Sequence, residues 1–217
     1  MWLGLVDPIN TSHINENLYA VKTGFVNFYI YTKGTDYVAF DSGIKEHIIS
    51  RELAVLGITP DDISAVFLSH SDFDHVGGLP LFRNASIYLS HDEEQLITGK
   101  TARKLGCIHN RRLNMPYTLL EEGDIVSVGS ISVRAIETPG HTIGSMSYII
   151  DEKILYVGDT FTFRRGRVCP VAFFLNMDKS SLHESLRKLG KLTNIQFALT
   201  GHRGYTDDFA KAIEHWY

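Results

Sequence analysis

The stretch from Ser69 to Gly78, with the sequence SHSDFDHVGG, limits the possible folds and functions of this chain most strongly. It follows the apolar run 65–68 and places four side chains that can bind a metal ion within six residues. These side chains are His70, Asp72, Asp74 and His75. A short apolar run that ends in a turn predicts a buried strand, and α/β sheets tend to carry sites at the carboxyl ends of their strands. Mixed imidazole and carboxylate ligands suit zinc, iron or manganese.

Three further residues of the same kinds occur in the same sequence context. His141, Asp159 and His202 each follow an apolar run and each have a glycine beside them. An isolated His-x-Asp pair is more simply explained by surface residues or by a helix N-cap. Ligand-type residues at four separate strand ends instead favour one shared metal site.

The order of these residues resembles the metallo-β-lactamase superfamily, whose members share a His-x-His-x-Asp-His motif followed by a distant His, Asp and His. Residues 24–30 and 40–43 also match the opening strands and the Asp-x-Gly turn of that family, so the resemblance runs from about residue 17 to residue 204. It implies an α/β (α+β) fold, a four-layer αββα sandwich with two metal ions in a groove at one edge of both sheets. Because no repeat or linker is visible, we expect residues 1–217 to form one domain.

The resemblance also implies a role for each residue. One metal ion would be held by His70, Asp72 and His141, the second by Asp74, His75 and His202, and Asp159 would bridge the two. The ions would be zinc, with iron or manganese as alternatives. Asp74 would also orient the attacking water and accept its proton. Asp41 either hydrogen-bonds a ligand histidine or is a plain turn residue.

Position 72 departs from the common pattern, because most of the family has histidine where this chain has Asp72. Flavodiiron proteins place a glutamate there and hold iron. Asp72 is therefore either a ligand that favours iron or manganese, or a carboxylate that caps the following helix or hydrogen-bonds a ligand residue.

The resemblance implies a metal-dependent hydrolase of a small ester, lactone, thioester or phosphodiester. Asp159 stands where many zinc β-lactamases use a cysteine, which makes antibiotic hydrolysis less favoured. The alternative is an iron-binding protein that handles oxygen, nitric oxide or a persulfide, as Asp72 suggests. A metal-dependent binding or sensing protein with little turnover is a third hypothesis that no residue supports directly.

The segment after Asp159 bears on the substrate. Arg164, Arg165 and Arg167 are expected in a loop beside the groove, where a guanidinium could bind an anionic small molecule. The alternative is a solvated basic loop. The apolar segment 168–175 that follows either walls the substrate pocket, packs in a homodimer interface or forms a buried strand.

The composition excludes some classes of protein. A chain of 217 residues that is 44% hydrophobic can bury a substantial core. Its net charge of −4 gives no reason to expect nucleic-acid binding. Neither a signal peptide nor a membrane span is visible, and two cysteines imply no disulfide framework. We therefore expect a cytoplasmic protein.

Hydrophobic periodicity predicts the remaining elements. Helices are expected at 45–56, 76–83, 91–97, 180–192 and 207–216. Strands are expected at 17–32, 36–41, 65–68, 87–89, 125–128, 131–137, 144–150, 153–157 and 195–199. Residues 98–117 show no clear periodicity.

Overall fold

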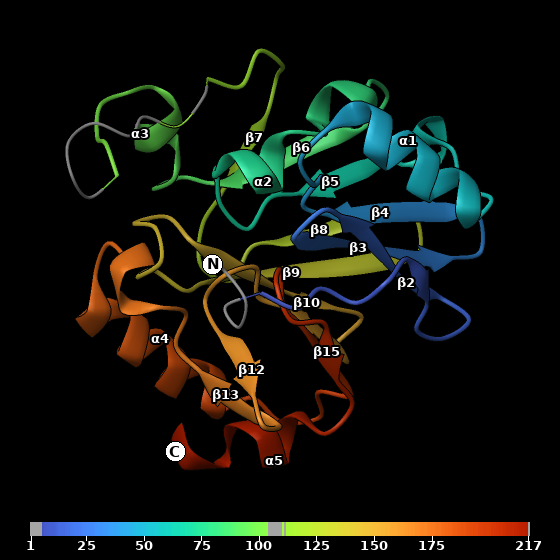
Figure 1. Ribbon diagram of the computed structural model, residues 1–217. Coiled ribbons are helices and arrows are strands. Elements are labelled where there is room, and N and C mark those ends of the chain that lie inside the picture. Colours follow the sequence, from blue (N-terminus) through green and yellow to red (C-terminus); the bar gives the residue numbers. More distant parts are fainter. Residues whose placement is uncertain (1–5, 104–109, 111, 217) are drawn as a thin grey trace.

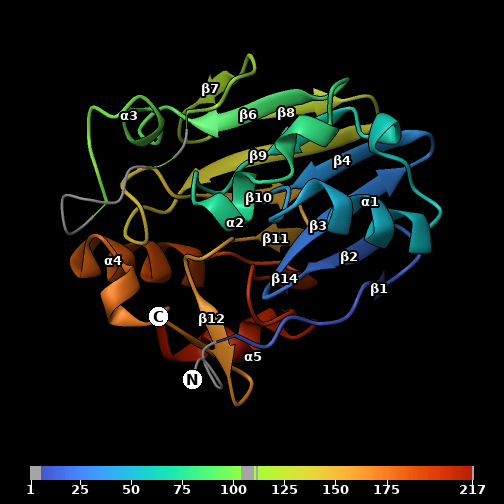
Figure 2. The same cartoon turned by 45° about the horizontal axis from the view of Figure 1, so that its top comes forward.

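Two β-sheets packed face to face form the centre of the structure (Figures 1 and 2). The computed structural model describes residues 6–103, 110 and 112–216. Within these ranges, the first sheet has seven strands and the second has six. The first sheet runs in the order β1-β2-β3-β4-β5-β6-β7, and the second in the order β15-β14-β11-β10-β9-β8.

The first sheet changes from antiparallel to parallel at its middle. Strands β1 to β4 pair antiparallel, whereas β4 to β7 pair parallel. The strands are β1 Ser12–His13, β2 Leu18–Thr23, β3 Val26–Lys33, β4 Asp36–Phe40, β5 Ala65–Phe67, β6 Ser86–Ser90 and β7 Thr118–Leu120. The carboxyl ends of β4 and β5 therefore meet at one edge of the sheet.

The second sheet is antiparallel apart from the parallel pair of β11 and β14. Its strands are β8 Ile125–Val128, β9 Ile131–Glu137, β10 Met146–Ile150, β11 Ile154–Tyr156, β14 Phe197–Leu199 and β15 Tyr205–Thr206. A separate hairpin consists of β12 Thr162–Arg164 and β13 Arg167–Cys169.

Helices cover the outer face of each sheet, which completes four layers. Helix α1 (Glu46–Val55) packs on the first sheet, and α4 (Lys179–Gly190) and α5 (Phe209–Ile213) pack on the second (Figure 1). The shorter helices are α2 Phe73–Val76 and α3 Glu94–Ile97, together with the 3₁₀ turns Pro60–Asp62, Leu79–Leu81, Phe173–Leu175 and Glu214–Trp216. The expected αββα sandwich is confirmed. Of the helices in the described ranges, none is both long and apolar enough to cross a membrane.

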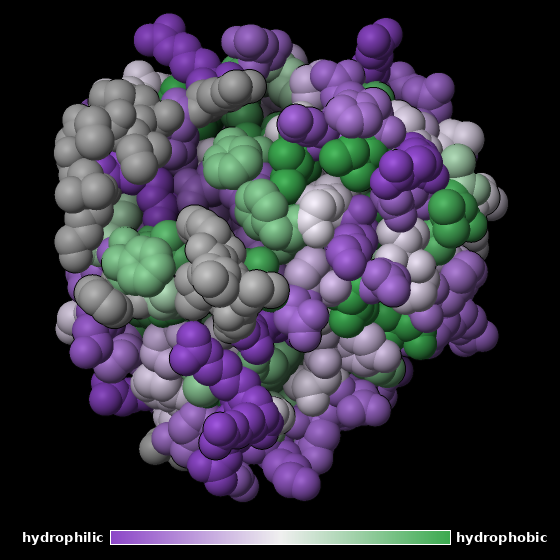
Figure 3. Space-filling view, viewed as in Figure 1, coloured by the Kyte–Doolittle hydropathy of each residue, from purple (hydrophilic) through white to green (hydrophobic). Residues whose placement is uncertain are grey.

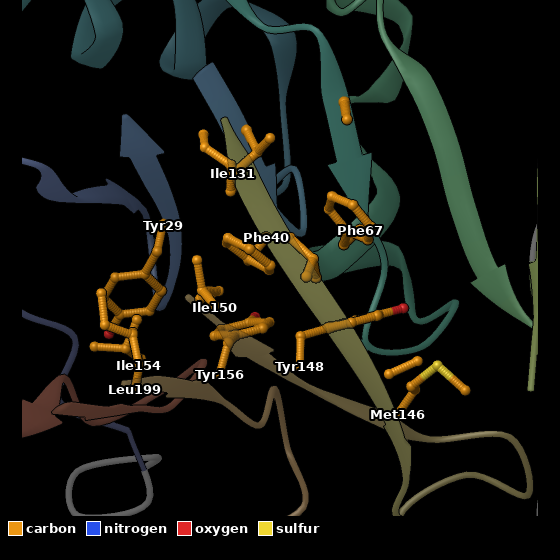
Figure 4. Close-up of a cluster of buried hydrophobic side chains, with 14 of the residues drawn as sticks. Tyr29, Phe40, Phe67, Ile131, Met146, Tyr148, Ile150, Ile154, Tyr156 and Leu199 are labelled. Atoms are coloured by element: carbon orange, nitrogen blue, oxygen red, sulfur yellow. The ribbon is translucent and has the colours of Figure 1, made fainter. Parts of the chain in front are cut away.

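Alternation along the strands builds the three hydrophobic layers. Tyr29 and Phe40 point between the sheets, whereas their neighbours Phe28 and Ala39 face α1. The second sheet alternates in the same way, with Tyr148, Tyr156 and Leu199 facing the first sheet (Figure 4). Successive side chains of a strand point to opposite faces of the sheet, so a strand that is buried on both faces contributes to two hydrophobic layers.

The local structure after β5 differs from the expectation. A helix was expected at 76–83, but α2 begins at Phe73 and ends at Val76, so the ligand motif itself forms the helix. Gly77 and Gly78 are not needed for a left-handed turn, because Gly77 has φ −66° and Gly78 has φ −93°. They are needed for close approach. A Cβ atom on Gly77 would overlap the carbonyl oxygen of Ile44, and one on Gly78 would overlap that of Ser42.

Candidate metal centre

The predicted ligands meet at the edge where four strands of both sheets end. The motif loop follows β5, and Asp41 follows the parallel neighbour β4. Asp159 follows β11, and His202 follows its parallel neighbour β14. His141 lies in the turn between β9 and β10. Residues that are far apart in the sequence are therefore neighbours in the fold, as the resemblance implied.

The first donor group consists of His70, Asp72 and His141, whose potential ligand atoms lie within 4.8 Å of one another. Asp72 Oδ2 is 3.5 Å from Nε2 of His70 and 3.4 Å from Nε2 of His141. Asp72 occupies the N-cap position of α2, but its side chain makes no capping hydrogen bond. Its side chain is therefore directed to the donor group and not to the helix.

The second donor group consists of Asp74, His75 and His202, again within 4.8 Å. Asp74 Oδ2 is 3.7 Å from Nε2 of His75 and 3.5 Å from Nε2 of His202. Both Asp74 and His75 belong to α2 and are buried.

Asp159 contacts both donor groups. Its Oδ2 atom is 3.6 Å from Nε2 of His141, in the first group, and 3.1 Å from Nε2 of His202, in the second. Its Oδ1 atom is 3.6 Å from Nε2 of His75. A carboxylate in this position is suited to bridge two cations.

Each of the four histidines is held by its Nδ1 atom, so that Nε2 points to the interior of the site. The partners are Ser69 Oγ for His70 at 2.9 Å, Asp41 Oδ2 for His75 at 2.6 Å, Asn176 Oδ1 for His141 at 3.2 Å and the carbonyl oxygen of Phe25 for His202 at 2.8 Å. Hydrogen bonds of this kind fix the tautomer and the ring orientation of metal-binding histidines.

Asp41 contacts other parts of the structure in addition to its ligand histidine. Its carboxylate accepts hydrogen bonds from the backbone N–H of Ser69 at 2.7 Å, from Ser69 Oγ at 2.7 Å and from the hydroxyl of Tyr156. With the contact to His75, these hydrogen bonds occupy both oxygens. Asp41 thus orients the histidines and is not a turn residue only.

The site has the chemistry that a divalent metal ion requires. The Nε2 atoms of His70 and His75 and Oδ1 of Asp159 are buried and have no hydrogen-bond partner among the described residues. Ligand atoms around a tetrahedral zinc ion, bonded at about 2.1 Å, lie about 3.4 Å apart. The separations of 3.4 to 3.7 Å within each donor group agree with that value.

The clustering of imidazoles and carboxylates changes their proton affinity. Burial opposes a charge on His75, but Asp159, Asp74 and Asp41 outweigh it and raise the pKa of the imidazole to about 10 from an ordinary value of 6.5. The pKa of His202 is also raised, because Asp159 outweighs the effect of burial. Burial would raise the pKa of Asp159, yet His202 and His75 hold it well below its ordinary value.

We expect metal binding to release protons. Without metal, His75 keeps its proton up to about pH 10, and this proton stabilises the fold fully below the ordinary pKa and no longer above pH 10. A metal ion binds only the neutral imidazole, so at pH 8 the second donor group should release at least one proton for each ion bound. Calorimetric titrations at pH 8 in two buffers of different ionisation enthalpy measure this number. Identical heats in both buffers would contradict the expectation.

A buried glutamate that sequence reasoning missed connects two ligand loops. Glu93 is fully buried and accepts hydrogen bonds from the backbone N–H of Ser71 at 2.8 Å and from its hydroxyl at 2.7 Å. Its other oxygen accepts from Thr142 Oγ1 at 2.6 Å and from the backbone N–H of Gly144 at 3.2 Å. Burial raises its pKa. Glu93 therefore joins the motif loop to the turn that carries His141.

The substitution Glu93→Gln should weaken both the fold and the first donor group. The amide has one acceptor oxygen and leaves at least one buried donor unpaired, which costs about 1–3 kcal/mol of the free energy of unfolding. We expect a lower melting temperature and at least tenfold weaker metal binding at the first group. Glu94→Gln is the control, because Glu94 is only half-buried and the amide oxygen can still accept the hydrogen bond from Tyr117. An unchanged melting temperature for Glu93→Gln would refute this role.

A cavity of about 540 Å³ opens onto both donor groups. Asp72, Asp74, His141, Asp159 and His202 form its metal-binding side. Most of its other lining is apolar and includes Phe25, Phe73, Phe161, Val171, Ala172 and Leu175. Phe73 is 59% exposed and Phe25 is 40% exposed. Figure 3 shows apolar side chains gathered next to the position of α2. The cavity can therefore take an apolar group beside the donor atoms.

The arginine-rich segment forms a hairpin where a loop was expected, and its three arginines differ in position. Arg164, at the end of β12, lines the cavity. Arg165 lies in the turn with φ +53°, and Arg167 is 3.8 Å from Glu214 in an exposed ion pair. Of these three arginines, Arg164 is therefore the one that lines the cavity.

The apolar segment 168–175 serves two of the purposes considered for it. Val168 is buried in the core beneath the second sheet, whereas Val171, Ala172 and Leu175 line the cavity. The beginning of the segment thus belongs to the hairpin strand β13, of which only Val168 is buried, and its end is a wall of the cavity.

Arg103 is the second residue of the site that the sequence did not reveal. Its guanidinium lies 2.6 Å from Asp72 Oδ2, and it lines the cavity. It belongs to the segment 98–117, whose pattern predicted no element. Burial would raise the pKa of Asp72, but hydrogen bonds from His141 and His70 hold it well below its ordinary value.

The chain belongs to the metallo-beta-lactamase superfamily, whose family profile matches residues 21–202. The probable metallo-hydrolase MJ0296 of Methanocaldococcus jannaschii is 31% identical over 159 residues, which cover 73% of this chain and 66% of the relative. The probable metallo-hydrolase YqgX of Bacillus subtilis is 28% identical over 188 residues, which cover 83% of this chain and 86% of the relative. These relatives support a metal-dependent hydrolase.

Other relatives carry a more specific name. A hydroxyacylglutathione hydrolase of Rhodopseudomonas palustris is 30% identical over 160 residues, 70% of this chain, and the match spans 54% of the relative's length. Among solved structures, a B3 metallo-beta-lactamase with an active-site glutamic acid has a TM-score of 0.73 at 18% identity and covers 99% of this chain and 88% of its own. That similarity shows the fold, which agrees with the four-layer sandwich.

Proposed function

We propose that the protein is a binuclear metallohydrolase that cleaves a small thioester or ester. The position of Asp159 is the observation that carries this proposal, because its carboxylate lies within 3.6 Å of histidine Nε2 atoms of both donor groups. A single metal ion would need only one of these groups. The bridging position gives a reason for four histidines and three carboxylates to share one site.

The residues of the two groups would hold the ions through Nε2 and carboxylate oxygens. Two divalent cations held here would lower the pKa of a water molecule and polarise the carbonyl oxygen of the substrate. Asp74 lines the cavity, so its carboxylate can orient the attacking water and accept its proton. A substrate that fills the apolar part of the cavity would displace water from it and thereby strengthen the electrostatic interactions at the donor groups.

The cavity supports a substrate that combines an apolar or small acyl group with an anionic group. Phe25, Phe73 and Phe161 provide apolar surface beside the donor groups, and Arg164 provides a positive charge on the same lining. An acyl group carried on glutathione is a thioester, and the name of the Rhodopseudomonas relative makes such compounds the first to test.

The variant Asp159→Ala tests the proposed function. It removes the carboxylate that would offset the repulsion between two cations, so we expect hydrolysis to fall at least a thousandfold and metal content to fall from about two ions per chain to one or none. The measurements are elemental analysis and turnover of chromogenic thioesters, esters and phosphodiesters. Elemental analysis of the wild type also identifies the native metal.

The fold should survive this substitution, because most stability comes from the hydrophobic layers, and circular dichroism provides the check. A variant that retains both ions and near-normal turnover would show that Asp159 does not bridge. A wild-type protein that takes up no metal would refute the proposed function as a whole.

The charge of the substrate is tested with Arg164→Ala. A charge-assisted hydrogen bond contributes about 1.5–3 kcal/mol, so its loss should lower kcat/KM for anionic substrates about ten- to a hundredfold. Neutral esters should be nearly unaffected. Arg167→Ala is the matched control, since it removes the same charge from the same hairpin but outside the cavity lining. Equal losses on charged and neutral substrates would mean that Arg164 supports the structure and not recognition.

A further inference from the structure

Arg103 contacts the carboxylate of Asp72, the residue that stands where most of the family has histidine. One of its terminal nitrogens, Nη1, is 2.6 Å from Asp72 Oδ2 and 3.4 Å from His141 Nε2. The other, Nη2, donates a hydrogen bond to the carbonyl oxygen of Leu175 in the wall of the cavity. The side chain of Arg103 is only 11% exposed. The guanidinium is therefore fixed on two sides and is not a loose surface cation.

The oxygen that Arg103 binds is the oxygen that a metal ion would need. Asp72 Oδ2 is also the atom that faces the Nε2 atoms of His70 and His141. The second oxygen, Oδ1, accepts a hydrogen bond of 3.3 Å from Asn110. A metal ion bound by this group would share the carboxylate with a guanidinium, and two cations at such a short distance repel each other.

The second donor group has a different electrostatic environment. Asp74 faces His75 and His202, and Asp159 faces histidines of both groups. These imidazoles become neutral ligands when a metal ion binds, whereas an arginine keeps its charge. Among the contacts of the described residues, the arginine that lies within hydrogen-bond distance of a donor carboxylate is Arg103, at Asp72 of the first group.

We propose that Arg103 sets the metal affinity of the first donor group, by competing with the metal ion for Asp72 Oδ2. The first group then binds its cation more weakly than the second group and fills only when the guanidinium gives up this oxygen. The proposal rests on the proposed function, in that both need metal ions in these two groups.

The experiment is a titration of the metal-free protein with Zn²⁺ by calorimetry, supported by Co²⁺ absorption. In the wild type, the second ion should bind at least tenfold more weakly than the first. Asp72→Asn should remove the weak binding step and leave the tight step within threefold, which assigns the weak step to the first group. Arg103→Gln should tighten the weak step at least tenfold and leave the tight step unchanged.

Two further variants keep the result interpretable. Arg164→Gln is the matched control, because it removes a positive charge from the same cavity and leaves the contact between Arg103 and Asp72 in place. Both binding steps of this variant should stay within threefold of the wild type. Arg103→Lys, which keeps the charge on a shorter-reaching group that cannot hold Asp72 and Leu175 together, should tighten the weak step less than Arg103→Gln does. If Arg103→Gln gives too little folded protein, Arg103→Lys is compared with the wild type instead, and a weak step that is no tighter than in the wild type overturns the inference.

The possible outcomes separate this inference from the proposed function. Unchanged or weaker binding at the weak step in Arg103→Gln overturns the inference, since Arg103 would then be neutral or would position Asp72 for the metal. Equal affinity of both sites in the wild type overturns it as well. A wild type that binds no metal ion overturns the proposed function first, and with it the basis of the inference.

Discussion

The buried carboxylate of Asp41 is the interaction on which the metal centre depends. It joins the end of β4 to the motif loop through Ser69, to α2 through His75, and to the second sheet through Tyr156. A buried charge is costly unless hydrogen bonds satisfy it, so all of these donors have to be in place together. The contacts that hold the two sheets together at Asp41 therefore also orient the ligand histidines.

Both donor groups depend on this one residue. Asp41 holds His75 of the second group directly, and it holds His70 of the first group through the hydroxyl of Ser69. The backbone of Asp41 has φ +62°, a conformation that costs a residue with a side chain about 1–3 kcal/mol. This backbone conformation directly after β4 places the carboxylate of Asp41 against Ser69 in the loop after β5, where its hydrogen bonds offset the cost. The Nε2 atoms are thus aimed inward by the protein itself.

The sequence predicted the donor atoms better than their surroundings. His70, Asp72, Asp74, His75, His141, Asp159 and His202 stand in a recognisable order, and the structure brings them together. Glu93 and Arg103 left no such sign, because their roles arise from contacts to residues 22 to 72 positions away. The hairpin of β12 and β13 was also missed, since its short strands carry charged residues and lack a clear period.

The aspartate at position 72 shows why a motif alone does not define a metal site. Replacing the common histidine by aspartate adds a negative charge to the donor atoms, and in isolation this would strengthen the attraction for a cation. Arg103 adds a positive charge 2.6 Å from that carboxylate, so the net charge around the two groups returns to that of the common pattern. The compensating residue comes from a segment without periodicity, and it also holds Leu175 in the cavity wall. The electrostatics of the first group and the shape of the substrate cavity are therefore linked through one side chain, and a change at position 72 can be understood only together with position 103.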